Sequence, residues 1–329
     1  MPKAPEYPLP FARESTPEGE ERRPHAAPTR PESLDEILDR ARRLLDAGDA
    51  DGATEVCREA IERSSGPAEA WRQLGIILEA AGRWPEACEA FERSLAGEPG
   101  NAEVWLHLGN ARISGDQPAR ASEAYEEMLR LRPRDARGWF NLGFALCRSS
   151  RLEQARHAYR EALRLRPEDA GTWYNLGNVY LDSGRMDEAG TCYEQALAFD
   201  AAEADAWTNL ALVRATQGRM QDAARCYLKV LEVRPRSAST WNALGAIWSR
   251  LGDNDRALDC FKAAIKIDEQ AAAYLLNRAL AHARLGDEGA MIEDLERAIR
   301  LNPLLADLVP TLTPFAPYLE SERVQRLLS

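Results

Sequence analysis

The chain repeats one pattern of apolar and polar positions with a period of 34 residues. Tryptophan recurs at this interval, and an aliphatic residue takes the same place in the first and last copies: Ile37, Trp71, Trp105, Trp139, Trp173, Trp207, Trp241 and Leu275. The period predicts eight units, residues 34–67, 68–101, 102–135, 136–169, 170–203, 204–237, 238–271 and 272–305. Positions are numbered 1 to 34 within each unit below.

Each unit carries two stretches in which apolar residues recur every three or four positions, which predicts two amphipathic helices of about fourteen residues. A short polar turn separates them, with glycine at the same position in most units and Asp116 or Ser150 in two others. A left-handed residue there ends the first helix. Proline follows most of the second helices and prevents their continuation, although Ala201 and Glu269 replace it in two units.

Small and large residues alternate in register with this pattern. Position 8 is glycine or alanine, position 20 is alanine, and position 24 is phenylalanine or tyrosine in the inner units, as in Gly177, Ala189 and Tyr193. Small residues allow helices to approach closely, and the aromatic rings are expected to fill the remaining space.

These residues resemble the tetratricopeptide repeat family over residues 34–305. The resemblance implies an all-α fold, a right-handed α-solenoid whose concave face is lined by the first helix of each unit. Arg40 and Arg278 stand where the inner units carry leucine. Because end units lack one neighbour, we expect these two arginines to keep the ends of the stack soluble.

The two termini lie outside the repeat. Residues 1–33 are rich in proline and poor in apolar anchors, which predicts a disordered arm. Residues 306–329 are expected to cap the last unit, with a docking peptide for another molecule as the alternative. An extended arm could also fold back into the concave groove as an inhibitor.

Charge and hydropathy narrow the class of partner and the compartment. The formal net charge of −11 is spread along the chain, which argues against nucleic acid as a partner. The chain has no run of 18 apolar residues, so insertion into a membrane is not predicted. Residues 1–33 do not resemble a secretory signal, and we therefore expect a cytoplasmic protein. Nothing in the sequence fixes an oligomeric state.

Motifs for catalysis or for a cofactor are not evident. The four histidines fall in different parts of the chain, and no C-x-x-C occurs. Cys192, Cys226 and Cys260 share position 23 of successive units, where stacked helices are roughly 8–10 Å apart, too far for a disulfide or a shared zinc. We therefore expect a protein without catalytic activity, cofactor or metal.

Asparagine occupies position 6 of three consecutive central units, at Asn141, Asn175 and Asn209. An asparagine amide can donate to and accept from one peptide group, so such a row could hold an extended backbone. The row is similar to the asparagine ladder in the repeat domain of O-linked N-acetylglucosamine transferases. The alternative is that asparagine is simply common at this position of the repeat.

Apolar residues stand beside this row at other inner positions: Leu106, Phe140, Phe144, Tyr174, Leu181 and Leu212. Such a patch indicates recognition, and packing between first helices is the alternative. Asn178 and Asn209 also match the two asparagines of the carboxylate clamp found in some tetratricopeptide domains. The clamp's lysine position is taken by Tyr174, so binding of a chaperone C-terminus is not predicted.

The sequence therefore predicts a non-catalytic protein-protein interaction scaffold. We expect it to bind an extended peptide or protein segment in the concave groove. Two alternatives remain at this point: a self-assembling structural scaffold, and a substrate-recruiting accessory subunit of a separate enzyme.

Overall fold

A computed structural model describes residues 32–63 and 67–328 of the chain. Of the predicted arm, residues 1–31 lie outside the described part. The first helices of the eight units are α1 (Leu34–Asp46), α3 (Ala68–Ala80), α5 (Ala102–Ser114), α7 (Ala136–Arg148), α9 (Ala170–Asp182), α11 (Ala204–Thr216), α13 (Ala238–Arg250) and α15 (Ala272–Leu285). Each begins at position 1 of its unit, as the repeat predicts.

The second helices are each 14 residues long. They are α2 (Ala50–Arg63), α4 (Trp84–Gly97), α6 (Pro118–Leu131), α8 (Leu152–Leu165), α10 (Met186–Phe199), α12 (Met220–Val233), α14 (Asn254–Ile267) and α16 (Glu288–Leu301). Among the described residues no strand is present. The prediction of an all-α solenoid is confirmed.

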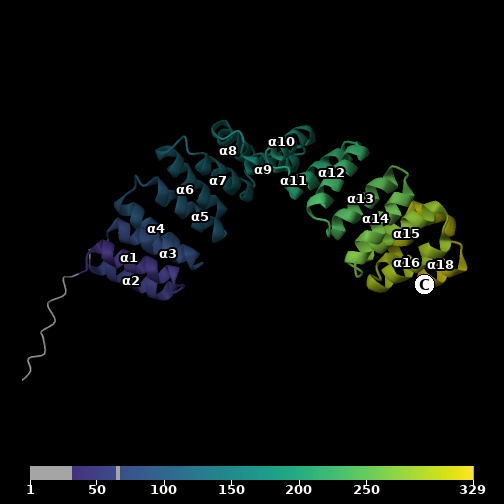
Figure 1. Ribbon diagram of the computed structural model, residues 1–329, viewed down its shortest axis with the longest axis horizontal. Helices are drawn as coiled ribbons and strands as arrows, with labels where there is room; N and C mark the ends of the chain where they lie inside the picture. Colours follow the sequence, from purple (N-terminus) through teal and green to yellow (C-terminus); the bar gives the residue numbers. More distant parts are fainter. Residues whose placement is uncertain (1–31, 64–66, 329) are drawn as a thin grey trace, which may run out of the picture.

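The helix pairs stack side by side into an arch, with the first unit at one foot and the last unit at the other (Figure 1). At the top of the arch, α8 and α10 lie on the outside and α9 lies beneath them. First helices of neighbouring units also touch directly, as α1 touches α3 and α7 touches α9. The first helices therefore line the inner side of the curve.

In five of the units, packing depends on glycine at position 8 facing an aromatic ring at position 24. A Cβ atom added to Gly109 would lie 2.3 Å from the Tyr125 ring, and one added to Gly177 would lie 2.6 Å from the Tyr193 ring. Both separations are shorter than carbon atoms tolerate. Both tyrosines are at most 2% exposed. The glycines thus let each ring lie flat against the backbone of the first helix.

Neighbouring units are joined by a hydrogen bond that recurs with the repeat. The indole Nε1 of the position-4 tryptophan donates to the backbone oxygen of position 32 in the preceding unit. The distance is 2.8 Å for Trp173 to Pro167 and 2.9 Å for Trp207 to Ala201. Phenylalanine could fill the same space but has no donor, so this bond accounts for tryptophan at position 4.

The turn between the helices of a unit requires a left-handed residue. Six glycines adopt positive φ there, and Asp116 (φ 56°) and Ser150 (φ 58°) adopt it without the freedom of glycine. A residue with a Cβ atom pays roughly 1 kcal/mol or more for this conformation. Asp116 also accepts a hydrogen bond from Arg148 at 2.6 Å, whereas the side chain of Ser150 makes no such contact with a described residue.

We expect Ser150→Gly to raise the free energy of unfolding by about 0.5–1 kcal/mol, because relief of the left-handed strain exceeds the extra entropy that glycine gives the unfolded chain. The reverse change, Gly184→Ser, places a Cβ atom at φ 72° with open space around it and should cost a similar amount. Urea unfolding followed by circular dichroism measures both variants. Destabilisation by Ser150→Gly would contradict the argument.

At the C-terminal end, residues 305–328 fold over the last helix pair as α17 (Leu305–Leu308), η1 (Val309–Thr311), η2 (Thr313–Tyr318) and α18 (Glu322–Leu328). Val309, Phe315 and Val324 are at most 1% exposed and pack against α15 and α16. The Tyr318 hydroxyl donates to the Ala283 carbonyl at 2.9 Å. This segment covers the apolar surface of the last unit. In the inner units the equivalent surface is buried against the following unit.

The arginines at the two ends of the stack do not simply face water, as the sequence suggested. Arg278 on α15 donates through Nε and Nη2 to the two oxygens of Asp294 on α16, at 2.7 and 2.6 Å. The Asp294 side chain is 4% exposed. Arg40 pairs with Glu59 at 2.5 Å. Position 7 therefore carries a paired charge at the ends in place of the leucine of the inner units.

Candidate functional site

The concave face presents apolar side chains of the central first helices to solvent. Phe144 on α7 is 39% exposed and Leu212 on α11 is 49% exposed. Both stand at position 9 of their units, two units apart. They are the most accessible of the apolar residues that the sequence placed in the groove.

The other predicted apolar residues are less accessible. Leu106 is 6% exposed and belongs to the core, so packing between first helices accounts for most of its surface. Phe140 and Tyr174 are half-buried. Their rings lie 5.9 Å from the ring of Tyr159 and 6.0 Å from the ring of Tyr193, respectively. Phe140 and Tyr174 thus form part of the groove wall.

The asparagine row bridges neighbouring first helices at two of its three positions. Asn141 Nδ2 donates to Asn110 Oδ1 at 3.3 Å, and Asn209 Nδ2 donates to Asn178 Oδ1 at 2.9 Å. Each acceptor also receives the hydroxyl of a buried tyrosine at 2.8 Å. Two asparagines of the row therefore connect neighbouring first helices, a structural role that sequence reasoning missed. Asparagine at position 9 of alternate units could have indicated this role.

Asn175 differs from its two neighbours in the row. Phe144 occupies position 9 of the preceding unit, so no asparagine is there to accept a bond, and Asn175 Nδ2 donates instead to the Gly171 carbonyl of its own helix at 2.9 Å. No described residue donates to the Oδ1 of Asn141, Asn175 or Asn209. All three amides keep Oδ1 as an acceptor for a ligand, and Asn141 and Asn175 also keep one N–H, whereas Asn209 Nδ2 donates a second time, to the Tyr193 hydroxyl at 3.4 Å.

These two observations combine into an alternation along the groove. Position 9 reads Asn110, Phe144, Asn178 and Leu212 in four successive units. Where position 9 is asparagine, its side chain accepts a hydrogen bond from the position-6 asparagine of the next unit and so connects the two first helices. Where it is apolar, the side chain stays exposed. The groove thus offers an apolar contact at every second unit and free amide groups between those contacts.

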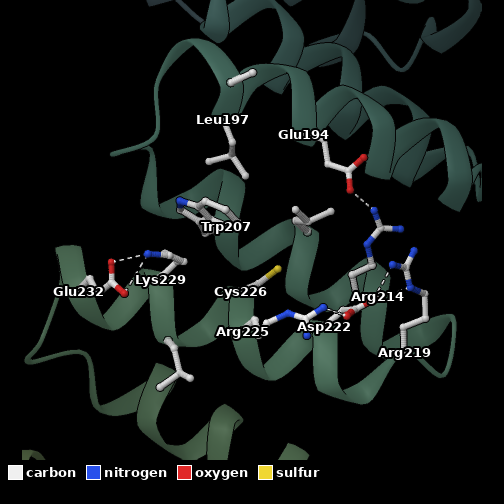
Figure 2. Close-up of a pocket in the computed structure, with 13 residues that line it drawn as sticks. Glu194, Leu197, Trp207, Arg214, Arg219, Asp222, Arg225, Cys226, Lys229 and Glu232 are labelled. Atoms are coloured by element: carbon white, nitrogen blue, oxygen red, sulfur yellow. Dashed lines mark hydrogen bonds and ion pairs between the residues drawn. The ribbon is translucent and has the colours of Figure 1, made fainter.

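A second hollow lies on the outer side, between α10, α11 and α12 (Figure 2). Its volume is about 610 Å³. Leu197, Trp207 and Cys226 contribute its apolar surface, and ion pairs surround it. These pairs join Arg214 to Glu194, Arg219 and Arg225 to Asp222, and Lys229 to Glu232.

Position 11 of this unit is an arginine, Arg214, which lines the outer hollow. In the units on either side, position 11 is Tyr180 or Trp248, and an arginine stacks over each ring at 5.0 or 4.7 Å. In the sixth unit Arg214 instead pairs with Glu194 of the preceding unit. Sequence reasoning treated only the inner positions and missed this feature.

The cysteines do not form a reactive or metal-binding centre. Cys57, Cys192, Cys226 and Cys260 are buried. Burial raises the pKa of Cys57, Cys226 and Cys260 to about 11 and that of Cys192 to about 12. Across the described chain, no group of three or more His, Cys, Asp or Glu side chains is placed to hold a metal ion. In the same part of the chain, no helix is long and apolar enough to cross a bilayer.

Stacked two-helix units with an inner groove define a class of helical repeat proteins, and the comparisons identify the family. A sequence model described as the cilia and flagella-associated protein 70 C-terminal domain matches residues 32–205. Two tetratricopeptide repeat models match residues 202–270 and 249–306. The chain therefore belongs to the tetratricopeptide repeat family, and over residues 32–205 it matches the family named for that C-terminal domain. Comparison with curated proteins gave no match.

Solved structures of tetratricopeptide proteins share the fold. The C-terminal part of a repeat-containing protein from Cytophaga hutchinsonii superimposes with a TM-score of 0.63 at 13% identity, covering 70% of this chain and 94% of that chain. Pseudomonas aeruginosa pilF gives 0.52 at 22% identity, covering 63% and 94%. YrrB, described as a TPR protein with an unusual peptide-binding site, gives 0.51 at 21%, covering 57% and 97%. These likenesses show the fold alone.

Membership of this family assigns the chain its general role. Tetratricopeptide arrays are protein-interaction scaffolds that bind proteins or peptides, and they are generally not catalytic. Which surface of this array binds, and what it binds, are separate questions.

Proposed function

We propose that the array binds an extended segment of another protein along its concave groove. The observation that supports this proposal most directly is the alternation at position 9. Phe144 and Leu212 are exposed apolar side chains of two first helices, and Asn141, Asn175 and Asn209 each keep an unused Oδ1 acceptor between and beside them. Exposed apolar residues cover a peptide's side chains, and amides hold its backbone.

The spacing of the groove sets the spacing of the bound segment. Neighbouring first helices are about 10 Å apart, so Phe144 and Leu212, two units apart, are separated by about 20 Å along the stack. An extended chain advances about 3.3 Å per residue. The bound segment should therefore carry two large apolar residues about six positions apart. Phe140, Tyr174 and Asn178 form the wall between these contacts.

The test compares two pairs of exposed apolar residues on opposite faces. The groove variant is Phe144→Ser with Leu212→Ser. The matched control is Phe199→Ser with Leu228→Ser, on the second helices α10 and α12, where the side chains are 49% and 44% exposed. Partners retained from a cell lysate by each immobilised protein are digested with protease while bound, and the protected peptides are sequenced.

We expect the native chain and the control to protect the same segments and the groove variant to lose them, with affinity reduced at least about tenfold by removal of two apolar contacts. Asn175→Ala should weaken binding without disturbing the stack, since Asn175 bridges no neighbouring helix. If only the control variant loses the protected segments, the binding surface is the outer hollow and not the groove. Retention by all variants, with mass rising with concentration, would favour self-assembly.

A further inference from the structure

A row of arginines lies where the groove meets the loop edge of the third and fourth units. Arg132, Arg134, Arg137 and Arg166 line a hollow of about 660 Å³ together with a single carboxylate, Asp135. The chain as a whole carries a formal net charge of −11. This hollow is therefore positively charged on a chain that is acidic overall. The hollow lies beside the concave face.

This basic hollow continues into an inner pocket of about 310 Å³, and Ala136, Arg137 and Arg166 border both. Leu106 and Phe140 supply apolar wall to the inner pocket, and Asn110 and Asn141 supply amides. Thr172 also lines it, and its buried hydroxyl has no hydrogen-bond partner among the described residues. The pocket therefore combines an apolar wall, unused polar groups, two cations at its border and one carboxylate, that of Asp169.

The charges of the border are only partly neutralised by the protein. Arg137 pairs with Asp135 at 2.9 Å and approaches Glu103 at 3.8 Å, and Arg132 also pairs with Glu103, at 3.1 Å. Arg166 is exposed, and its side chain makes no hydrogen bond or ion pair with another described residue. Asp169, which lines the inner pocket, uses Oδ1 to cap α9 and accepts there from Thr172 N at 2.9 Å.

We propose that the segment bound in the groove carries an aspartate or glutamate beside an apolar residue, and that Arg137 and Arg166 hold this carboxylate while the apolar neighbour enters the pocket between Leu106 and Phe140. This inference rests on the proposed function, because it assigns a chemistry to one end of the same groove. An Arg pair is suited to a carboxylate, since each guanidinium presents several donors in a plane. The acid lies at the end of the segment that is nearer the third unit.

The test is a selection of random dodecapeptides displayed on phage against the immobilised full-length chain. Parallel selections use three variants: Arg137→Gln with Arg166→Gln, the groove variant Phe144→Ser with Leu212→Ser, and the control Arg160→Gln. Arg160 is an exposed arginine of α8 away from the pocket. One enriched peptide is then labelled with fluorescein, and its affinity is compared by anisotropy with that of a copy whose acids are replaced by Asn or Gln.

We expect peptides enriched on the native chain and on Arg160→Gln to share an acid next to a large apolar residue. Replacing the acid should weaken binding about tenfold on the native chain and leave it unchanged on the Arg137→Gln, Arg166→Gln variant. Peptides that depend on Phe144 and Leu212 but show no preference for acids would overturn this inference and leave the proposed function standing. If no peptide is enriched, or if the same peptides are enriched on the native chain and on the groove variant, both the proposed function and this inference are overturned.

Discussion

Asp294→Ala is expected to lower the free energy of unfolding of the C-terminal units by about 3 kcal/mol. The substitution leaves the guanidinium of Arg278 without its partner, and the Arg278 side chain is only 19% exposed. Removing one member of a buried ion pair typically costs 3–5 kcal/mol, and the residual contact of Arg278 with solvent places this case at the lower end of about that range. Hydrogen exchange measured by mass spectrometry should show the loss over α15, α16 and the segment that covers them.

A double variant separates the ion pair from the packing around it. Inner units place leucine at position 7 and, in the fifth to seventh units, cysteine at position 23, as in Leu210 and Cys226. Arg278→Leu with Asp294→Cys copies that arrangement and removes both charges together. We expect its stability to be close to that of the native chain or above it, because an apolar pair needs no desolvation of charge. Equal instability of the single and double variants would show that the ion pair is not the cause.

The fold could be predicted because its main contacts recur in most of the eight units. A single Gly177 beside a single Tyr193 would be weak evidence, but the same small and large residues at a fixed interval indicate a packing rule. The structure gives the physical basis, since the ring lies against the glycine where a Cβ atom does not fit. Helix bounds followed from the same regularity, because turn residues and prolines interrupt each helix at fixed positions.

Departures from the repeat were harder to interpret, because their meaning depends on a neighbour in space. Arg278 looked like a solvated end residue, and only the fold shows that Asp294, sixteen residues later, faces it across the last helix pair. Arg214 likewise takes the place of an aromatic residue of the adjacent units, lines the outer hollow and reaches a glutamate of the preceding unit. Neither partner can be chosen from sequence spacing alone.

The candidate groove was predicted in part. The inner position of Phe144 and Leu212 followed from the register of the first helices, but their exposure depends on whether a neighbouring helix covers them. The asparagine row appeared uniform in the sequence, yet Asn141 and Asn209 bridge helices and Asn175 does not. The difference comes from position 9 of the preceding unit, a residue 31 positions away in the sequence. An inner position therefore has to be interpreted together with its partner in the first helix of the neighbouring unit.

Stability is expected to fall steeply as pH rises above 9, because four buried thiols resist ionisation in the folded chain. Burial raises the pKa of Cys57, Cys226 and Cys260 to about 11 and that of Cys192 to about 12, from an ordinary value of 9.0. Between these values the unfolded chain releases protons that the folded chain keeps, so the free energy of unfolding decreases with pH. Each thiol contributes about 1.4 kcal/mol per pH unit in this window, and the four together about 5 kcal/mol between pH 8 and pH 10.

The matched variant replaces these four cysteines by alanine and is judged by the slope of its unfolding midpoint against pH, since alanine also leaves small cavities that lower stability at every pH. Calorimetry at constant ionic strength between pH 8 and pH 10 should show a steep fall for the native chain and a much shallower one for the variant. Burial also raises the pKa of Tyr125, Tyr159 and Tyr193, but unfolded tyrosine ionises only near pH 10. Identical slopes below pH 10 would mean that the thiols ionise without unfolding, and water would then have to reach these four thiols in the folded chain.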